Sequence, residues 1–133
     1  MAMMRFTKHQ ILKESIENSQ ITPPQFGMLH CLKCVGPQTM KDIAQNMDLT
    51  HGACTGLIDR LHKLGLVERE RPDHDRRVVT VNITEAGENL IQRIQEKRHA
   101  ILRKIISQLT PEESRLLLKI HSFAKEKLQH YAD

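Results

Sequence analysis

The strongest constraint on the fold is a pair of closely spaced helices that lead straight into two strands. Thr39 precedes MKDIAQNM, whose apolar residues follow helical spacing, and Thr50 precedes a second helix that ends before Gly65. A threonine at either position can cap the first amide groups of the helix that follows it. The spacing therefore predicts two helices joined by a short turn.

Two runs with strand periodicity come next. Residues 67–71 place Val67, Arg69 and Arg71 on one face and two glutamates on the other, and residues 78–83 alternate in the same way. The residues between the two runs, PDHD, are typical of a turn. We therefore expect a hairpin.

Further helices flank this central part. The predicted ranges are residues 3–18, residues 23–35 after Thr22, residues 85–108 after Thr84, and residues 111–131 after Thr110. The chain should thus be mainly α-helical, with the order helix, helix, short helix, helix, hairpin, long helix, helix. A three-helix unit followed by a hairpin is typical of a winged helix-turn-helix, which we assign to residues 22–84 within a single domain of residues 1–133.

Length and charge narrow the function classes. A chain of 133 residues with a net charge of +4 fits one domain with a mild preference for an acidic partner such as nucleic acid. No apolar stretch reaches the roughly 18 to 20 residues that span a bilayer, and the N-terminus lacks the apolar core of a secretory signal. We expect a cytoplasmic protein that makes no membrane contact.

No group of residues has the order or spacing of a catalytic site. The sequence lacks a Ser/His/Asp arrangement, a phosphate-binding glycine loop and an isolated carboxylate pair. Its three cysteines cannot form a disulfide framework. We therefore expect neither an enzyme nor a bound cofactor.

The second helix of a helix-turn-helix enters the major groove of DNA, so its outward face matters most. At about 100° per residue, the inward face of residues 51–64 contains Cys54, Leu57, Ile58, Leu61 and Leu64. The outward face contains Gly52, Thr55, Gly56, Asp59 and Lys63, with His51, Arg60 and His62 on its flanks. Cys54 is then expected to be a small core residue.

The two outward glycines need an explanation, because each costs a helix about 0.5–1 kcal/mol relative to alanine. Close approach of the helix backbone to DNA would compensate for that cost and would bring His51, Thr55 and Arg60 to base edges or phosphates. The alternative is that Gly52 and Gly56 permit tight packing on another helix.

Three stretches of the sequence together resemble the MarR (multiple antibiotic resistance regulator) family of transcription factors. They are ITPPQFGMLHCL, TMKDIAQNMDLTHGACTGLIDRLHKLGLVER and DHDRRVVTVNITEAG, and the resemblance covers roughly residues 20–90. It implies a homodimer in which helices from residues 1–21 and 85–133 of two subunits intertwine. Each subunit would present its winged helix to half of a palindromic double-stranded DNA operator, typically repressing a gene until a small-molecule effector weakens binding.

The last two helices independently favour a dimer. They carry more apolar surface than a monomer of this length easily covers, at Leu116, Leu117, Leu118, Ile120, Phe123 and Leu128.

The expected DNA contacts lie on the two helix starts, the second helix and the hairpin. They are Thr39, Thr50, His51, Gly52, Thr55, Gly56, Arg60, Lys63, Arg69, Arg71, Arg76 and Arg77. Four acids balance four arginines in VERERPDHDRRVV, so the wing should act by position: one of its tip arginines enters the minor groove. Asp73 and Asp75 would brace these arginines.

His30, Cys31 and Cys34 lie close together on one helix and leave three interpretations open. They could be core cysteines, a thiol sensor or effector site, or a metal site. A zinc site needs three or four ligands, and no second CxxC or HxxxH completes one. We favour core cysteines and expect no metal.

Two other functions remain possible for a winged helix. One is a protein-interaction module or anti-repressor without DNA contact, although such a module would have no reason to keep Arg76 and Arg77. The other is RNA binding, which the shortage of aromatic side chains disfavours.

Overall fold

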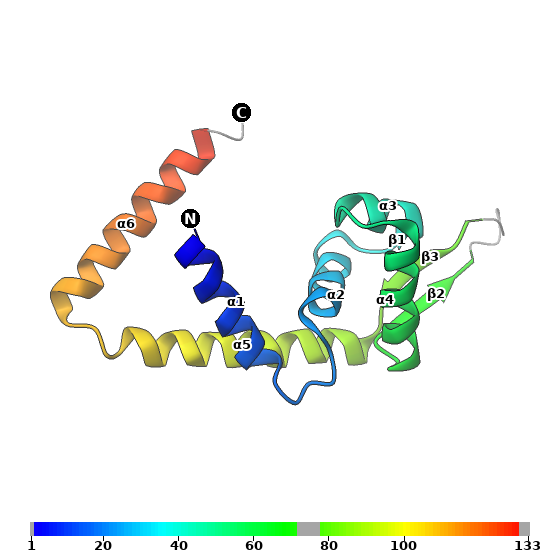
Figure 1. Cartoon of the computed structure of the whole chain (residues 1–133), viewed down its shortest axis with the longest axis horizontal. Helices are drawn as coiled ribbons and strands as arrows, with labels where there is room; N and C mark the ends of the chain where they lie inside the picture. The colour runs from blue at the N-terminus through cyan, green and yellow to red at the C-terminus, as the bar shows by residue number, and fades with distance from the viewer. Residues whose placement is uncertain (1, 72–77, 131–133) are drawn as a thin grey trace. The chain divides into compact units, whose positions relative to one another are not determined.

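The computed structural model describes the backbone of residues 2–71 and 78–130 and the side chains of residues 9–71 and 78–124 (Figure 1). The elements are α1 (Ala2–Ile16), α2 (Pro23–Val35), β1 (Gln38–Thr39), α3 (Met40–Asn46), α4 (His51–Lys63), β2 (Val67–Glu70), β3 (Thr80–Ile83), α5 (Glu85–Ile106) and α6 (Pro111–His130). The prediction of a mainly helical chain with a small hairpin is confirmed. The chain divides into two compact units, Met1–Arg98 and His99–Asp133.

The sheet has three strands rather than the two of a simple hairpin. β3 lies between β1 and β2 and pairs antiparallel with both, with Thr39 opposite Thr80 and Val67 opposite Ile83. The sequence prediction missed β1, because two residues are too few to show an alternating pattern. This short strand fixes the start of α3 against the base of the wing.

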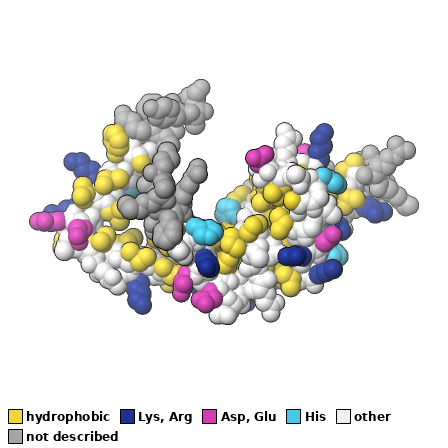
Figure 2. All heavy atoms as spheres, viewed as in Figure 1, with side chains coloured by type: hydrophobic (Ala, Val, Ile, Leu, Met, Phe, Trp, Pro, Cys, Tyr) yellow, Lys and Arg dark blue, Asp and Glu magenta, His cyan; other side chains and the backbone are white. Residues whose placement is uncertain are grey.

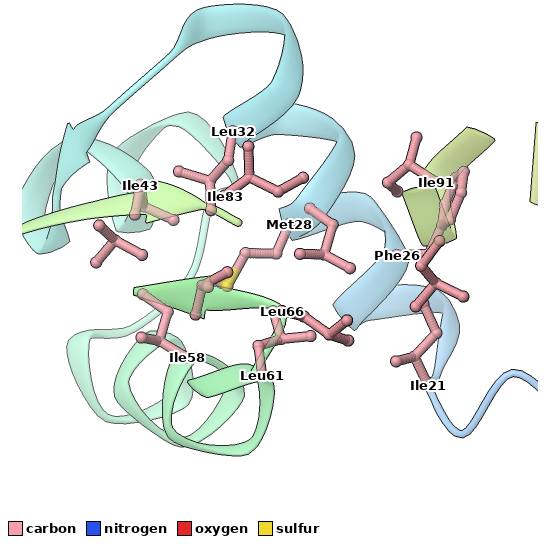
Figure 3. Close-up of a cluster of buried hydrophobic side chains, with 14 of the residues drawn as sticks. Ile21, Phe26, Met28, Leu32, Ile43, Ile58, Leu61, Leu66, Ile83 and Ile91 are labelled. Atoms are coloured by element: carbon pink, nitrogen blue, oxygen red, sulfur yellow. The ribbon is translucent and has the colours of Figure 1, made fainter. Parts of the chain in front are cut away.

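The core of the N-terminal unit is almost entirely aliphatic (Figure 3). Met28 and Leu32 of α2 and Ile43 of α3 are at most 1% exposed and lie among side chains from α4, the sheet and α5. Burying a side chain of this size contributes about 1.5–3 kcal/mol. This packing fixes the orientation of the helix-turn-helix.

The prediction that Leu64 lies on the inward face of α4 is wrong. Leu64 is 41% exposed, whereas Leu66 is buried at 8%. The helix ends at Lys63, and Gly65 follows with a φ of +69°, so the chain reverses there. The reversal turns Leu66 toward the core in the place that helical spacing had assigned to Leu64.

The start of α5 is tied to this reversal. Thr84 Oγ1 donates to the Gly65 carbonyl at 2.7 Å, accepts from Gly87 N at 3.2 Å, and Thr84 N donates to the Leu66 carbonyl at 3.1 Å. A Cβ at Gly87 would collide with the Leu66 carbonyl oxygen and with Ile83 Cγ1. Only glycine therefore fits where α5 crosses the backbone at Leu66.

The C-terminal unit contains the last turns of α5 and the whole of α6. A capping box starts α6, since Thr110 N donates to Glu113 Oε2 at 2.8 Å and Glu113 N donates to Thr110 Oγ1 at 3.3 Å. The Thr110 amide, and after it the Thr110 hydroxyl, which donates to Glu113 Oε2 at 3.0 Å, lower the pKa of the Glu113 carboxyl. Hydrophobic side chains lie exposed on this unit (Figure 2), among them Ile105, Leu116 and Ile120. Within the described ranges, no helix has both the length and the apolar character needed to cross a membrane.

Candidate nucleic-acid interface

Helix α4 presents one face to the core and the opposite face to solvent. Thr50 Oγ1 accepts from Ala53 N at 3.3 Å at its start, and Cys54, Ile58 and Leu61 are fully buried. These three anchors fix the rotation of the helix about its axis. The outward set expected from spacing is accordingly exposed or half-buried: His51, Gly52, Thr55, Gly56, Asp59, Arg60 and Lys63.

Gly52 and Gly56 both border open space. A Cβ added at either position would meet no heavy atom within 4 Å. The alternative that these glycines permit packing on another helix is therefore wrong for the part of the chain that the structure describes. Their cost in helix stability is not offset by any internal contact of this kind.

Two of the three threonines expected at the interface, Thr39 and Thr50, cap neighbouring helices. Thr39 Oγ1 accepts from Asp42 N at 3.2 Å and donates to Asp42 Oδ2 at 2.7 Å, at the start of α3. Thr50 caps α4 as described above. Both caps hold the starts of α3 and α4 in place, and Thr50 is itself exposed.

An ion pair that the sequence prediction missed connects α4 to the wing. Arg69 Nη2 of β2 donates to Asp59 Oδ1 of α4, and the two side chains are 34% and 46% exposed. Arg69 stands opposite the buried Val81, so it lies on the sheet face that turns toward the core. The prediction treated Arg69 only as a DNA contact and Asp59 only as outward; nothing in the spacing of the two residues indicated their pairing.

A hollow of about 510 Å³ lies between the start of α4 and the wing strands. Its lining residues are Met40, His51, Thr55, Arg69, Arg71 and Val79. Four of the residues that we expected to contact DNA, two from α4 and two from β2 and its end, thus meet around one depression. Arginine, histidine and hydroxyl groups are suited to phosphate oxygens.

The predicted wing tip lies outside the described residues. This holds for Arg76 and Arg77, and for the proposed braces Asp73 and Asp75. Arg71 is the last described residue before the tip and is exposed.

The three cysteines differ in environment. Cys54 is buried, which confirms the core interpretation, and its burial raises the pKa of its thiol. Cys34 is exposed, with Sγ 3.8 Å from His30 Nδ1, and Cys31 is half-buried and accepts from Gln38 Nε2 at 3.6 Å. The preferred core interpretation is therefore wrong for Cys34, because the last turn of α2 carries its side chain away from the core. No cluster of three or more His, Cys, Asp or Glu side chains suited to a metal occurs among the described residues.

A second hollow, of about 440 Å³, lies within the N-terminal unit. Loop residues after α1, the end of α4 and the α5 side chains Arg93 and Lys97 line it, together with Leu66, Leu90 and Ile94. The sequence prediction did not single out these residues, because they combine only when the loop, the turn at Gly65 and α5 come together.

Comparison with known proteins decides the family. Residues 21–79 match the MarR family. Over 118 residues the chain is 37% identical to the uncharacterized HTH-type transcriptional regulator YsmB of Bacillus subtilis, covering 89% of this chain and 78% of that protein. The chain belongs to the MarR family. It is thus a DNA-binding transcriptional regulator of the helix-turn-helix type and belongs to a family of regulators rather than enzymes.

Two further similar proteins cover most of the chain. The HTH-type transcriptional repressor MdtR of Bacillus subtilis is 34% identical over 112 residues, which are 84% of this chain and 71% of that protein. The crystal structure of YusO from Bacillus subtilis aligns with a TM-score of 0.78 and 32% identity, covering 96% of this chain and 89% of that one. The resemblance inferred from the wing and helix motifs is therefore confirmed.

Proposed function

We propose that this MarR-family chain is a repressor that binds a palindromic operator as a homodimer and releases it when an effector binds. The observation that carries the proposal is the hollow between α4 and the wing, lined by Arg69, Arg71, His51 and Thr55. A helix in the major groove and a wing tip in the adjacent minor groove must have one phosphodiester strand between them. The hollow has the position and the chemistry to receive that strand.

The helix starts and the outer turns of α4 supply the other proposed contacts. Thr39 and Thr50 lie at the N-termini of α3 and α4, where hydroxyl and amide groups favour phosphate. Arg60 and Lys63 are exposed toward the C-terminal end of α4. Gly52 and Gly56 let the helix backbone approach the bases.

The exposed apolar side chains of the C-terminal unit support the homodimer. Leu116, Ile120 and Phe123 are 58%, 55% and 61% exposed, and at about 100° per residue they fall on one side of α6. An apolar face of this kind commonly marks an interface, and a second copy related by a two-fold axis would match a palindrome.

Selection from random DNA followed by a salt series tests the proposal. We expect the selected sequences to share two inverted half-sites about 10 base pairs apart, centre to centre. The logarithm of the association constant should fall steeply with the logarithm of salt concentration, by about 0.9 for each phosphate contact. A selected site without dyad symmetry would contradict the palindrome, and a flat salt dependence would contradict the phosphate contacts.

The wing tip gives a sharper test within the same assay. Arg76→Ala or Arg77→Ala should weaken the operator complex on the order of tenfold with little change in stability. Asp75→Ala should also weaken it if the carboxylate braces an arginine, although the substitution removes a negative charge. Tighter binding by Asp75→Ala would show simple repulsion and contradict the brace.

The alternative function is a protein-interaction module without DNA contact. It predicts that substitutions of Arg71, Arg76 and Arg77 leave every measurable activity unchanged. The membership of the MarR family and the basic lining of the hollow favour DNA.

The hollow beside Arg93 and Lys97 is our candidate for the effector site, with no single compound favoured. Two cations over an apolar wall suit an amphipathic anion. Arg93→Ala combined with Lys97→Ala should leave operator affinity intact and abolish release by any anionic effector found in a screen.

A further inference from the structure

The first two turns of α4 are poor in side chains that read bases by hydrogen bonding. Paired hydrogen bonds to guanine come from Arg or Lys, and those to adenine come from Asn or Gln. The first two turns of α4, residues 51–58, read HGACTGLI and contain none of these four residue types. In a helix-turn-helix the N-terminal residues of this helix are the ones that reach base edges.

The polar groups that do lie along this face are already engaged. Thr55 Oγ1 donates to the His51 carbonyl at 2.9 Å, so its proton is used inside the helix. Asp59, which could otherwise accept from cytosine, is paired with Arg69. Among the side chains of residues 51–59, the His51 ring is then the hydrogen-bond donor that has no partner within the described structure.

Beside His51, the exposed residues of these two turns are small. Gly52, Ala53 and Gly56 are all exposed, and a Cβ at either glycine would meet no heavy atom within 4 Å. Met40 and Val79 add apolar lining to the hollow beside Thr55. The major-groove group that such a surface can recognise is the 5-methyl of thymine.

We propose that α4 discriminates bases mainly by contact of thymine methyl groups with the Gly52, Ala53 and Gly56 surface, rather than by hydrogen bonds to base edges. The proposal rests on the proposed function, since it assumes that this face of α4 enters the major groove of the operator. It assigns Gly52 and Gly56 as specificity-determining residues: a methyl on the DNA occupies the space that a side chain would fill.

Methyl removal on the DNA tests this with unaltered protein. Each thymine of the selected operator is replaced in turn by deoxyuridine, which keeps every hydrogen-bonding group and lacks only the methyl. Dissociation constants are measured by fluorescence anisotropy. We expect about a fourfold loss of affinity for each methyl that contacts α4. A scan in which no thymine responds overturns the inference.

Methyl addition on the protein is the complementary change. Gly56→Ala should weaken binding to the thymine operator at least tenfold, because its new methyl competes for the same space. It should also raise the melting temperature, since an open glycine in a helix is replaced by the best helix former. Gly27→Ala in α2, whose Cβ would lie 3.6 Å from Met47 Cε, is the matched control and should leave DNA affinity unchanged.

Combining the deoxyuridine operator with the alanine variants tests whether the thymine methyl contacts these glycines. Deoxyuridine at the responsive position should recover at least threefold of the affinity that Gly56→Ala or Gly52→Ala loses, because one methyl then replaces the other. If the two losses simply multiply for both glycines, the contact is absent and the inference is wrong. A selected operator without dyad symmetry would instead contradict the homodimer proposal, and the deoxyuridine scan would still decide the methyl contact on that sequence.

Discussion

The two compact units of this chain treat their apolar side chains in opposite ways. Among the described side chains of Met1–Arg98, seventeen hydrophobic residues from Ile16 to Ile94 form one buried cluster. In His99–Asp133, none of the described side chains, residues 99–124, is buried. The first unit therefore has a core of its own, whereas the second carries exposed apolar side chains. Packing within the chain thus stabilises the first unit, and the proposed homodimer would bury the apolar side chains of the second.

The largest expected effect is a difference in the alkylation rates of two cysteines, which tests whether the core of the first unit excludes reagents. Cys34 should react with iodoacetamide at nearly the rate of a free thiol, because it is exposed, whereas Cys54 should react at least a thousandfold more slowly. Burial and the raised pKa of the Cys54 thiol both oppose reaction until the core opens. Mass spectrometry of digested samples gives the two rates. Equal rates would mean that the core is open.

A charged residue introduced on α6 tests whether the apolar side chains of the second unit are buried in the proposed dimer. Ile120→Glu should convert the proposed dimer to a monomer and weaken operator binding about a hundredfold, because a symmetric interface would bury the carboxylate twice. Ser122→Glu is the matched control, since it lies two residues on and about 200° round the helix. Light scattering gives the mass and circular dichroism the helix content. A monomeric wild type would contradict the prediction.

Gly87→Ala tests the packing of the first unit at its tightest point. The new Cβ would collide with the Leu66 carbonyl, and such overpacking costs about 1–3 kcal/mol of unfolding free energy. Gly56→Ala, with open space around its Cβ, should be neutral or stabilising. Urea titrations of both variants check the contrast. Equal effects would mean that Gly87 has room for a side chain.

The ion pair between α4 and the wing should have the smallest effect. A double-mutant cycle with Asp59→Ala and Arg69→Ala should give a coupling of about 0.2–1 kcal/mol in unfolding free energy, because both side chains are more than a third exposed. The same cycle on operator affinity should give a larger coupling if the pair positions the wing. No coupling in either measurement would mean that the contact is incidental.

The helices could be predicted from the sequence because the residues that cap their starts are adjacent to them in the chain. Thr39, Thr50, Thr84 and Thr110 each precede a helix, and within the residues that the structure describes no helix boundary differs from its predicted position by more than two residues. The outward face of α4 followed equally from spacing, because three buried anchors fix its rotation.

The features that were missed depend on residues distant in the sequence. β1 forms only by pairing with β3, Arg69 meets Asp59 only across the wing, and Gly87 is required only because α5 crosses the backbone at Leu66. Leu64 was placed inward by periodicity, which fails at a helix end where the chain turns away. Cys34 was placed in the core because cysteine is commonly buried, and its position in the last turn of α2 leaves it exposed instead.

The hydrogen bonds from Thr84 to Gly65 and Leu66 also bear on how the wing can vary. They hold together the two ends of the segment between Leu66 and Thr84. The chain entropy lost in bringing these ends together depends only weakly on the length of the segment. Doubling the length of such a loop costs only about 0.6 kcal/mol more. The wing can therefore lengthen by insertion or shorten by deletion while the core beneath it stays intact.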